Sequence, residues 1–363
     1  MIRRPRLHID WPLLLGLSLL FGISLLVSLS ASGGDLPQLQ AQAMRWLVGG
    51  VMMLAVAQLS PALLLRWTPY VYALGLLLLI AVAVAGDMGK GAQRWLQIGP
   101  IRFQPSELMK LAVPMAIAWY FSDRQLPPKF HELLIATGLI LLPAGLIFKQ
   151  PDLGTALLVS AAGFIVIFLA GIRWRWIIAT AAAAAAAAPF AWQHLHAYQR
   201  QRVLTFLSPE SDPLGSGYHI IQSNIAIGSG GLFGKGFLNG TQNQLSFLPE
   251  SSTDFIFAVL AEEFGFVGAL FLLALYGIVI GRSFVIAASA QSTYGRLLSG
   301  SLLLTFVIYI LVNIGMVSGV LPVVGIPLPL ISYGGTSMLT LMVGFGLLMS
   351  IQSHRQMFHG GIS

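Results

Sequence analysis

Long runs of apolar residues, separated by shorter polar stretches, dominate this chain. A helix needs about 20 apolar residues to cross roughly 30 Å of hydrocarbon, so each run predicts a transmembrane helix. Ten such runs are found, at about residues 11–30, 45–63, 69–86, 107–122, 132–148, 154–172, 177–192, 255–281, 298–320 and 336–351. The pattern predicts an all-α polytopic membrane protein in which residues 1–363 form a single membrane domain.

The connection at about 193–253, between the predicted helices 7 and 8, is far longer than a link requires, which is typical of functional loops. Residues 218–227 are apolar and amphipathic, which predicts a helix along the membrane interface. Residues 228–240 are rich in glycine but lack the spacing of a phosphate-binding P-loop, because Ser229 and Gly236 stand at two of its required positions. We expect a large extracytoplasmic loop here.

Composition excludes several classes of protein. Hydrophobic residues make up 56% of the chain and charged residues only 9%, whereas about a quarter of a soluble globule is charged. Cysteine is absent, which rules out disulfides and a thiol nucleophile. The histidines lack zinc-site spacing, and we interpret His194 and His196 as loop residues.

The charges predict the orientation in the membrane. Three short connections are basic, with the sequences RWT, DRQLPPK and RWRW, which favours a cytoplasmic position for them and for both termini. The first run follows Arg3, Arg4 and Arg6 but exceeds a signal-peptide core, so we expect an uncleaved anchor. Further cations gather in outer segments 87–110 and 193–253. Either they form a solvated surface or they bind an anionic ligand such as a lipid diphosphate.

Ionisable residues also lie at the edges of the apolar runs. Glu107 and Lys110 are three residues apart on one helical face, where they form either a structural ion pair or a cavity floor that holds a substrate or cation. Lys149 and Asp152 flank a proline in a short outer turn, and we expect Asp152 to cap the next helix.

Asp254 stands at the predicted outer start of helix 8. A helix N-terminus favours an ionised carboxylate, so Asp254 is either a simple cap or a functional acid. Glu262 and Glu263 are adjacent and point about 100° apart, so at most one is expected to face a shared cavity. Residues 313–337 are dense in proline and glycine, and irregular backbone at this depth indicates a cavity lining.

Four segments carry a resemblance to a known family. They are RFQPSELMK at 102–110, KQPDLGTAL at 149–157, FLPESSTDFIFAVLAEE at 247–263 and GVLPVVGIPLPLISYGGTS at 319–337. The chain resembles, over nearly its whole length, the SEDS family (shape, elongation, division and sporulation), which are polytopic glycosyltransferases that polymerise peptidoglycan. The last segment is most similar to the rod-shape branch. One departure is Ser251-Ser252, where many relatives carry a charged residue, often histidine.

The resemblance implies a peptidoglycan polymerase that uses lipid II, an undecaprenyl-diphosphate-linked disaccharide pentapeptide. It implies that Asp254 is the general base for the acceptor 4-hydroxyl, which attacks the donor anomeric carbon with inversion. Arg94, Arg102 and Lys110 are candidate clamps for the diphosphate. The implied substrate-binding residues are Arg94, Arg102, Glu107, Lys110, Lys149, Asp152 and Ser332. No cofactor is certain, and a divalent cation, magnesium or manganese, held by Glu107 or Asp152 is an option.

The resemblance also implies a place and partners. It implies the cell inner membrane and a single-pass class B penicillin-binding protein transpeptidase, together with other elongation-complex membrane proteins and no nucleic acid. A lipid II flippase is the main alternative, but a transporter places its polar groups near the midplane, whereas here they cluster at the outer end. A scaffold without catalysis is a third hypothesis, and it would tolerate Asp254→Asn.

Overall fold

The computed structural model describes residues 8–89, 92–98, 101–194, 197–208, 210 and 215–354. Ten helices coincide with the predicted spans: α1 (Trp11–Ala31), α2 (Leu36–Ala57), α3 (Pro61–Ala85), α4 (Pro105–Phe121), α5 (Phe130–Lys149), α6 (Leu153–Leu169), α7 (Trp174–His194), α11 (Ile256–Ser289), α12 (Thr293–Val317) and α13 (Thr336–Ser353). By length and composition, seven of them can cross a membrane: α1, α2, α3, α5, α11, α12 and α13. The predicted helical membrane fold is confirmed.

The starts of α2 and α3 and the end of α11 differ from the prediction by eight or nine residues. Helix α3 begins at Pro61, so the RWT sequence lies inside this helix and is not the predicted connection. Helix α2 begins at Leu36, nine residues before the predicted span, because Pro37 starts the helix and its first turns are polar rather than apolar. The segment after α3 contains a small antiparallel sheet with the strand order β1 (Asp87–Gly89), β2 (Ala92–Ile98) and β3 (Ile101–Phe103). Strands of three to seven residues give too little alternation to be detected by periodicity.

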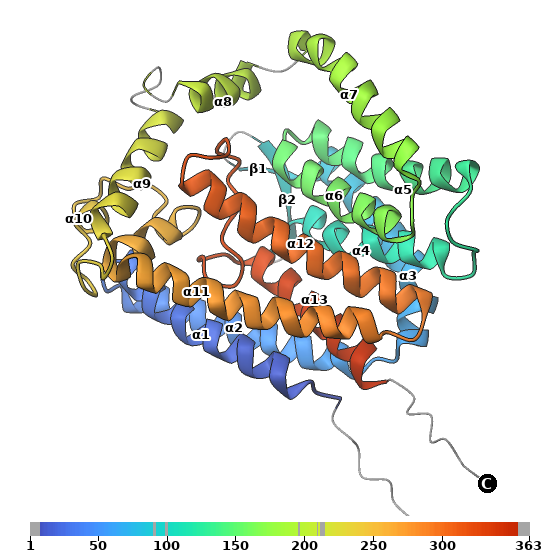
Figure 1. Cartoon of the computed structure of the whole chain (residues 1–363), viewed down its shortest axis with the longest axis horizontal. Helices are drawn as coiled ribbons and strands as arrows, with labels where there is room; N and C mark the ends of the chain where they lie inside the picture. Colours follow the sequence, from blue (N-terminus) through green and yellow to red (C-terminus); the bar gives the residue numbers. More distant parts are fainter. Residues whose placement is uncertain are drawn as a thin grey trace, which may run out of the picture.

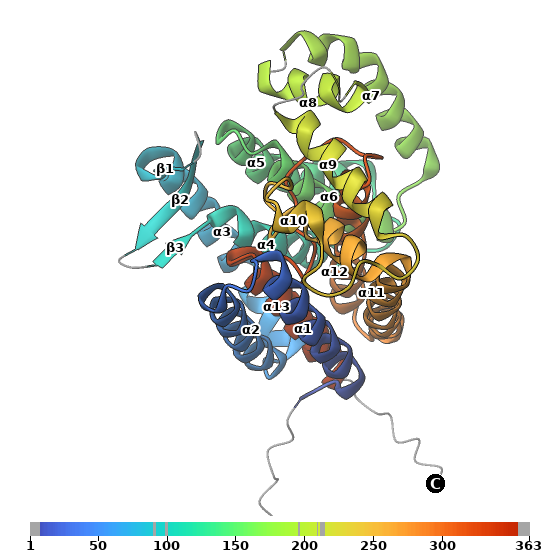
Figure 2. The same cartoon turned by 90° about the vertical axis from the view of Figure 1, so that its left-hand side faces the viewer.

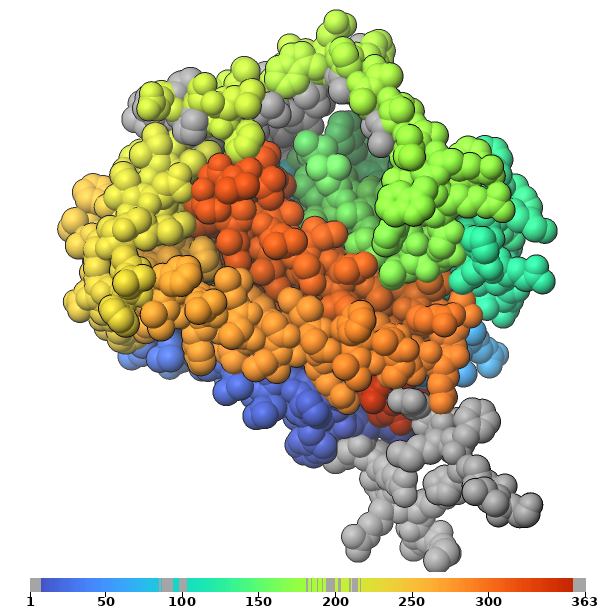
Figure 3. Space-filling view, viewed as in Figure 1, coloured from blue at the N-terminus to red at the C-terminus, as the bar shows by residue number. Residues whose placement is uncertain are grey.

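The helices pack side by side in a bundle (Figures 1 and 2). Helix α1 lies against α11, α2 against α13, and α5 against α6. Helix α4 is almost wholly buried, because α3, α6, α12 and α13 all contact it. Figure 3 shows a hollow between α7 and α12. The centre of the bundle is therefore α4 with α12 and α13, and this is where polar residues can be shielded from lipid.

The described part of the long connection between α7 and α11 contains three α-helices, α8 (Ala197–Leu207), α9 (Ser216–Gly230) and α10 (Thr241–Gln244). The helix predicted at 218–227 is confirmed as part of α9. It packs against α11 and α12, and the Ser223 hydroxyl donates to the Val317 carbonyl at 2.7 Å. At the opposite end of the bundle, the rings of His8 and His354 stack 4.0 Å apart. The two ends of the described chain therefore lie at one end of the bundle, as the ten predicted spans would require.

Candidate active site

A polar cavity of about 240 Å³ lies between α4, α6, α12, α13 and the irregular segment before α13. Its polar and charged lining residues are Arg94, Gln104, Glu107, Lys110, Asp152, Thr155, Tyr309, Thr336 and Ser337. Four of the predicted substrate-binding residues are thus brought together from three separate parts of the sequence. The segment from Val324 to Pro327 forms another part of the wall.

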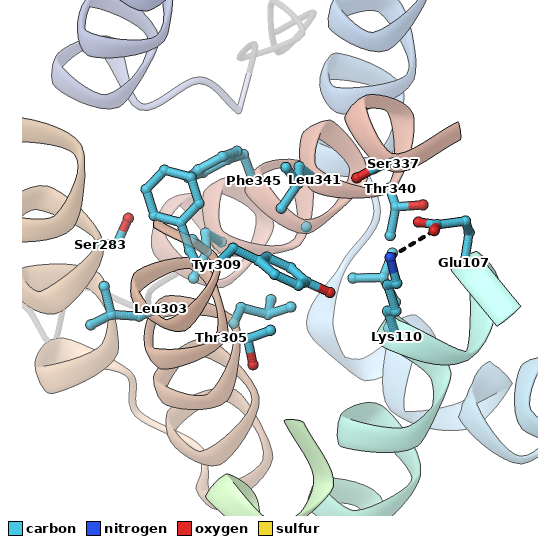
Figure 4. Close-up of a pocket in the computed structure, with 15 residues that line it drawn as sticks. Glu107, Lys110, Ser283, Leu303, Thr305, Tyr309, Ser337, Thr340, Leu341 and Phe345 are labelled. Carbon is cyan, nitrogen blue, oxygen red and sulfur yellow. Dashed lines mark hydrogen bonds and ion pairs between the residues drawn. The ribbon is translucent and has the colours of Figure 1, made fainter. Parts of the chain in front are cut away.

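Glu107 and Lys110 form a buried ion pair on this cavity. Lys110 Nζ lies 2.6 Å from Glu107 Oε1, on the first turns of α4, and 5.5 Å from the centroid of the Tyr309 ring. Figure 4 shows these three side chains in a neighbouring pocket, which they also line. The second oxygen of Glu107 has no hydrogen-bond partner among the described residues. The two side chains therefore form an ion pair and also line a cavity.

Asp152 caps α6, as predicted, because its Oδ1 accepts a hydrogen bond from the Thr155 backbone N–H at 3.2 Å. Its Oδ2 accepts from Gln104 Nε2 at 3.2 Å and lies 3.7 Å from Arg94 Nε. Arg94 also donates to the backbone carbonyls of Gln150 and Pro151. This turn therefore joins strand β2 to α6 and places a guanidinium at the cavity edge.

Two side chains from distant segments hold the backbone around Asp254 by hydrogen bonds. Asn313 Nδ2 donates to the Asp254 carbonyl at 2.9 Å and to the Ile326 carbonyl at 2.7 Å. Ser332 Oγ donates to the Thr253 carbonyl at 2.5 Å. The N-cap residue of α11 is Phe255, so Asp254 lies one residue before the cap position. The irregular segment between α12 and α13 thus fixes the chain that carries this carboxylate.

Gly325 lies next to both Asp254 and the cavity. It has a φ of +79°, which favours glycine, and a Cβ placed on it would lie 3.3 Å from Asp254 Oδ2. Gly325 also lines the polar cavity. Asp254 does not itself line the cavity, but its carboxylate lies beside Gly325, which does.

Two of the other residues predicted to bind substrate, Lys149 and Ser332, do not line this cavity. Lys149 is exposed at the end of α5 and does not line this cavity. Ser332 is buried and also accepts from the Leu328 backbone N–H at 2.7 Å, which orders the turn before α13. The Arg102 side chain lies outside the described part of the chain, although its backbone belongs to β3. Neither Glu262 nor Glu263 lines the cavity, although both are buried.

Sequence reasoning missed Asn313, Tyr309 and Gln104. Asn313 is fully buried near the end of α12, and a carboxamide within an apolar span is itself a signal, because buried polar groups need partners. Its hydrogen bonds join α12 to Asp254 and to Ile326, and this pairing of distant segments is visible only in three dimensions.

The carboxylates of the cavity are already engaged by cations and hydrogen-bond donors of the protein. Glu107 Oε1 is occupied by Lys110, and Asp152 Oδ2 accepts from Gln104 and faces Arg94. Within the described ranges no group of three or more histidine, cysteine, aspartate or glutamate residues could hold a metal. Because these carboxylates already face cations, they do not make a ligand set for the expected magnesium or manganese, and no step below depends on one.

The fold and cavity define a multi-pass membrane protein with a charged site between its helices. A family model described as cell cycle protein, of the FtsW, RodA and SpoVE type, matches residues 6–357. The peptidoglycan glycosyltransferase MrdB of Escherichia coli K12 is 53% identical over 353 residues, which cover 97% of this chain and 95% of that protein. The peptidoglycan glycosyltransferase RodA of Treponema pallidum is 33% identical, covering 85% and 88%.

Two solved structures are similar in fold. One, described as structural coordination of polymerization and crosslinking by a peptidoglycan synthase complex, has a TM-score of 0.83 and 35% identity, covering 94% of this chain and 97% of that chain. The rod shape determining protein RodA of Thermus thermophilus has a TM-score of 0.73 and 30% identity, covering 96% and 98%. The chain belongs to the FtsW, RodA and SpoVE family. The sequence-based expectation of a peptidoglycan glycosyltransferase agrees with the names of these relatives.

Proposed function

We propose that this chain polymerises lipid II into glycan strands at the outer face of the cytoplasmic membrane, with Asp254 as the general base. One observation carries the proposal: the Asp254 carboxylate lies beside Gly325, which also lines the cavity that holds Lys110 and Arg94. A base and a cationic pocket, separated by a residue without a side chain, suit a reaction in which a hydroxyl is deprotonated and a diphosphate departs.

In this mechanism Asp254 takes the proton from the 4-hydroxyl of the acceptor GlcNAc. That oxygen bonds to the anomeric carbon of the donor MurNAc from the face opposite the diphosphate, so the configuration inverts from α to β. The bond from that carbon to the phosphate oxygen breaks, and its electron pair leaves with the diphosphate. Lys110 and Arg94 offset the negative charge of the leaving group, as does Arg102 in our proposal. Glu107, Asp152, Lys149 and Ser332 complete the proposed substrate-binding set.

The ion pair gives Lys110 a suitable starting state. Because Glu107 Oε1 lies 2.6 Å from Lys110 Nζ, the ammonium is kept charged in a buried place before substrate arrives. A diphosphate oxygen would compete with Glu107 for the same ammonium protons. The cavity therefore holds its positive charge without leaving it unpaired, which would be costly inside the membrane.

The test is polymerisation of labelled lipid II by the purified protein. We expect glycan strands from the wild type and a rate lower by about 10²–10⁴-fold for Asp254→Asn, because that is the usual contribution of a general base. Asp123→Asn makes the same chemical change at an exposed position between α4 and α5 and should leave the rate unchanged. A melting temperature equal to that of the wild type shows that each variant is folded.

Two outcomes contradict the proposal in different ways. Equal strand formation by wild type and Asp254→Asn removes Asp254 from the mechanism. No strands from the wild type, with the partner and with magnesium or manganese present, favours lipid transport or scaffolding.

We also infer a partner and a location. A single-pass class B penicillin-binding protein, with other elongation-complex membrane proteins, is the proposed partner, supported by the likeness to a chain of a peptidoglycan synthase complex. The inner membrane with both termini in the cytoplasm is the proposed location. It is supported by the basic residues of the connections between α4 and α5 and between α6 and α7, and by the stacking of His8 on His354 at one end of the bundle.

A further inference from the structure

The glycine-rich segment 231–238 plays no part in the proposed site, and its backbone is docked on a kink in α11. The kink lies at Gly265, whose φ is +67°. Around it, the N–H groups of Lys235 and Gly236 donate to the carbonyls of Glu262 and Glu263 at 3.0 and 2.9 Å. On the other side of the kink, Phe266 N donates to Gly231 O at 2.9 Å and Val267 N to Leu232 O at 3.1 Å. The loop thus satisfies backbone groups that the kink releases.

This docking explains the glycines. A Cβ on Gly234 would lie 2.1 Å from the carbonyl oxygen of Glu263, and one on Gly230 would lie 2.0 Å from that of Ala261. A Cβ on Gly265 would lie 2.3 Å from the backbone nitrogen of Gly234. Only glycine permits two backbones to approach this closely. The motif is therefore a backbone-to-backbone joint and not a phosphate cradle.

The single charge of the segment is neutralised within the protein. Lys235 Nζ lies 2.6 Å from Glu262 Oε1, which also accepts from Thr241 Oγ1 at 3.0 Å and from the Gln242 backbone N–H at 3.1 Å. The Glu262 side chain is fully buried. The remaining side chains at the tip of the loop are apolar, so the tip itself carries no unpaired charge.

The apolar side chains at the tip point outward. Phe233 is 81% exposed and Leu232 is 65% exposed. They adjoin a row of exposed apolar residues on α11, which includes Phe266, Val267 and Phe271. Figure 1 shows the loop region with α9 and α10 gathered at one end of α11. Because α11 is apolar and long enough to cross a membrane, its exposed apolar face is expected to contact lipid, and the tip of the loop continues that face.

The positions of the charged residues on α11 indicate how deep the loop lies in the membrane. Arg282 pairs with Asp10 at 2.6 Å near one end, and Glu262 and Glu263 lie near the other. From Glu263 to Arg282 a helix rises roughly 28 Å at about 1.5 Å per residue, close to the roughly 30 Å of the hydrocarbon layer. Because the loop is hydrogen-bonded to Phe266 and Val267, its tip lies just inside the outer boundary of that layer.

We propose that residues 231–238 form an outer-leaflet anchor, in which the docked loop inserts the side chains of Leu232 and Phe233 among the lipids. The anchor fixes the depth of the kink and of the buried first turns of α11, which begin just after Asp254. The occupant is the lipid of the outer leaflet, since the exposed tip is continuous with the lipid-facing side of α11 and carries no unpaired charge.

The absence of cysteine from the chain permits a direct test. Single-cysteine variants Phe233→Cys and Leu232→Cys are labelled with a nitroxide, and the protein alone is placed in lipid nanodiscs. Phe271→Cys on α11 is the lipid reference, and Asn239→Cys, exposed in the same connection, is the aqueous reference. Collision rates with oxygen, which partitions into lipid, and with a water-soluble nickel chelate are then measured by electron paramagnetic resonance.

We expect labels at 232 and 233 to match the one at 271, with oxygen collisions more frequent than nickel collisions, and the label at 239 to show the reverse. Nickel accessibility at 232 and 233 equal to that at 239 would overturn the anchor. Low accessibility to both reagents would show protein contact instead and would overturn it equally. The readout needs no polymerase activity, so its failure is distinguishable from failure of the proposed function.

Discussion

At the residue scale, the placement of Asp254 depends on hydrogen bonds from distant side chains to the backbone around it. Asn313 joins the carbonyls of Asp254 and Ile326, and Ser332 joins Thr253 to the turn before α13. Gly325 then leaves room for the carboxylate. Each bond is modest, about 0.5–1.5 kcal/mol, but together they set the direction in which Asp254 points.

Asn313→Asp provides a test of this positioning. The aspartate keeps the size of the side chain but loses the amide donor, so the two carbonyls are no longer held together. We expect polymerisation to fall by roughly 10–100-fold, because a displacement of about 1 Å can cost that much. The measurement is the rate at saturating lipid II, compared with Asn224→Asp, an exposed position on α9, which should retain activity. An unchanged rate for Asn313→Asp would mean that Asp254 is positioned by other contacts.

At the element scale, α11 behaves as two helices joined at Gly265, and the two parts have different surroundings. Its first turns, from Ile256 to Glu263, are buried in the protein and follow directly after Asp254. The remainder, from Phe266, exposes an apolar face. A straight helix could not place buried first turns beside a stem with an exposed apolar face while also hydrogen-bonding a loop at the joint.

Gly265→Ala should therefore destabilise the protein. The residue has a φ of +67°, and an added Cβ would lie 2.3 Å from the Gly234 nitrogen and 2.6 Å from the Leu232 carbonyl oxygen. We expect a loss of at least about 1–3 kcal/mol from backbone strain alone, seen as a lower melting temperature in detergent. Gly228→Ala is the control, because nothing lies within 4 Å of its Cβ and its helix α9 should gain slightly. Equal melting temperatures for the two variants would show that the kink relaxes freely.

At the scale of the whole molecule, the charged residues among the helices gather toward two opposite ends of the bundle. Arg282 and Asp10 pair near the end where His8 and His354 meet. The cavity with Glu107 and Lys110 lies toward the other end, beside the start of α11. This one-sided placement suits a reaction at a single membrane face better than passage across the membrane.

The proposed orientation makes a topological prediction. A green fluorescent protein fused after the last residue should fluoresce, because it remains in the cytoplasm, and alkaline phosphatase inserted at Asn239 should be active, because it lies outside. The reciprocal fusions serve as controls and should both be inactive. Phosphatase activity at the C-terminus would invert the proposed orientation.

The sequence by itself determined the membrane class, a helix at each of the ten apolar runs, the helix within the connection between α7 and α11, and the cap formed by Asp152. These depend on local physics: apolar length, helical period and capping chemistry act within a few residues. Only the tertiary structure decided that Lys110 both pairs with Glu107 and lines a cavity, that Lys149 lies outside it, and that Gly325 separates Asp254 from it. The same holds for the glycine-rich segment, whose role depends on the kink in α11. Such relations join residues tens to hundreds of positions apart, and packing, rather than sequence spacing, brings them into contact.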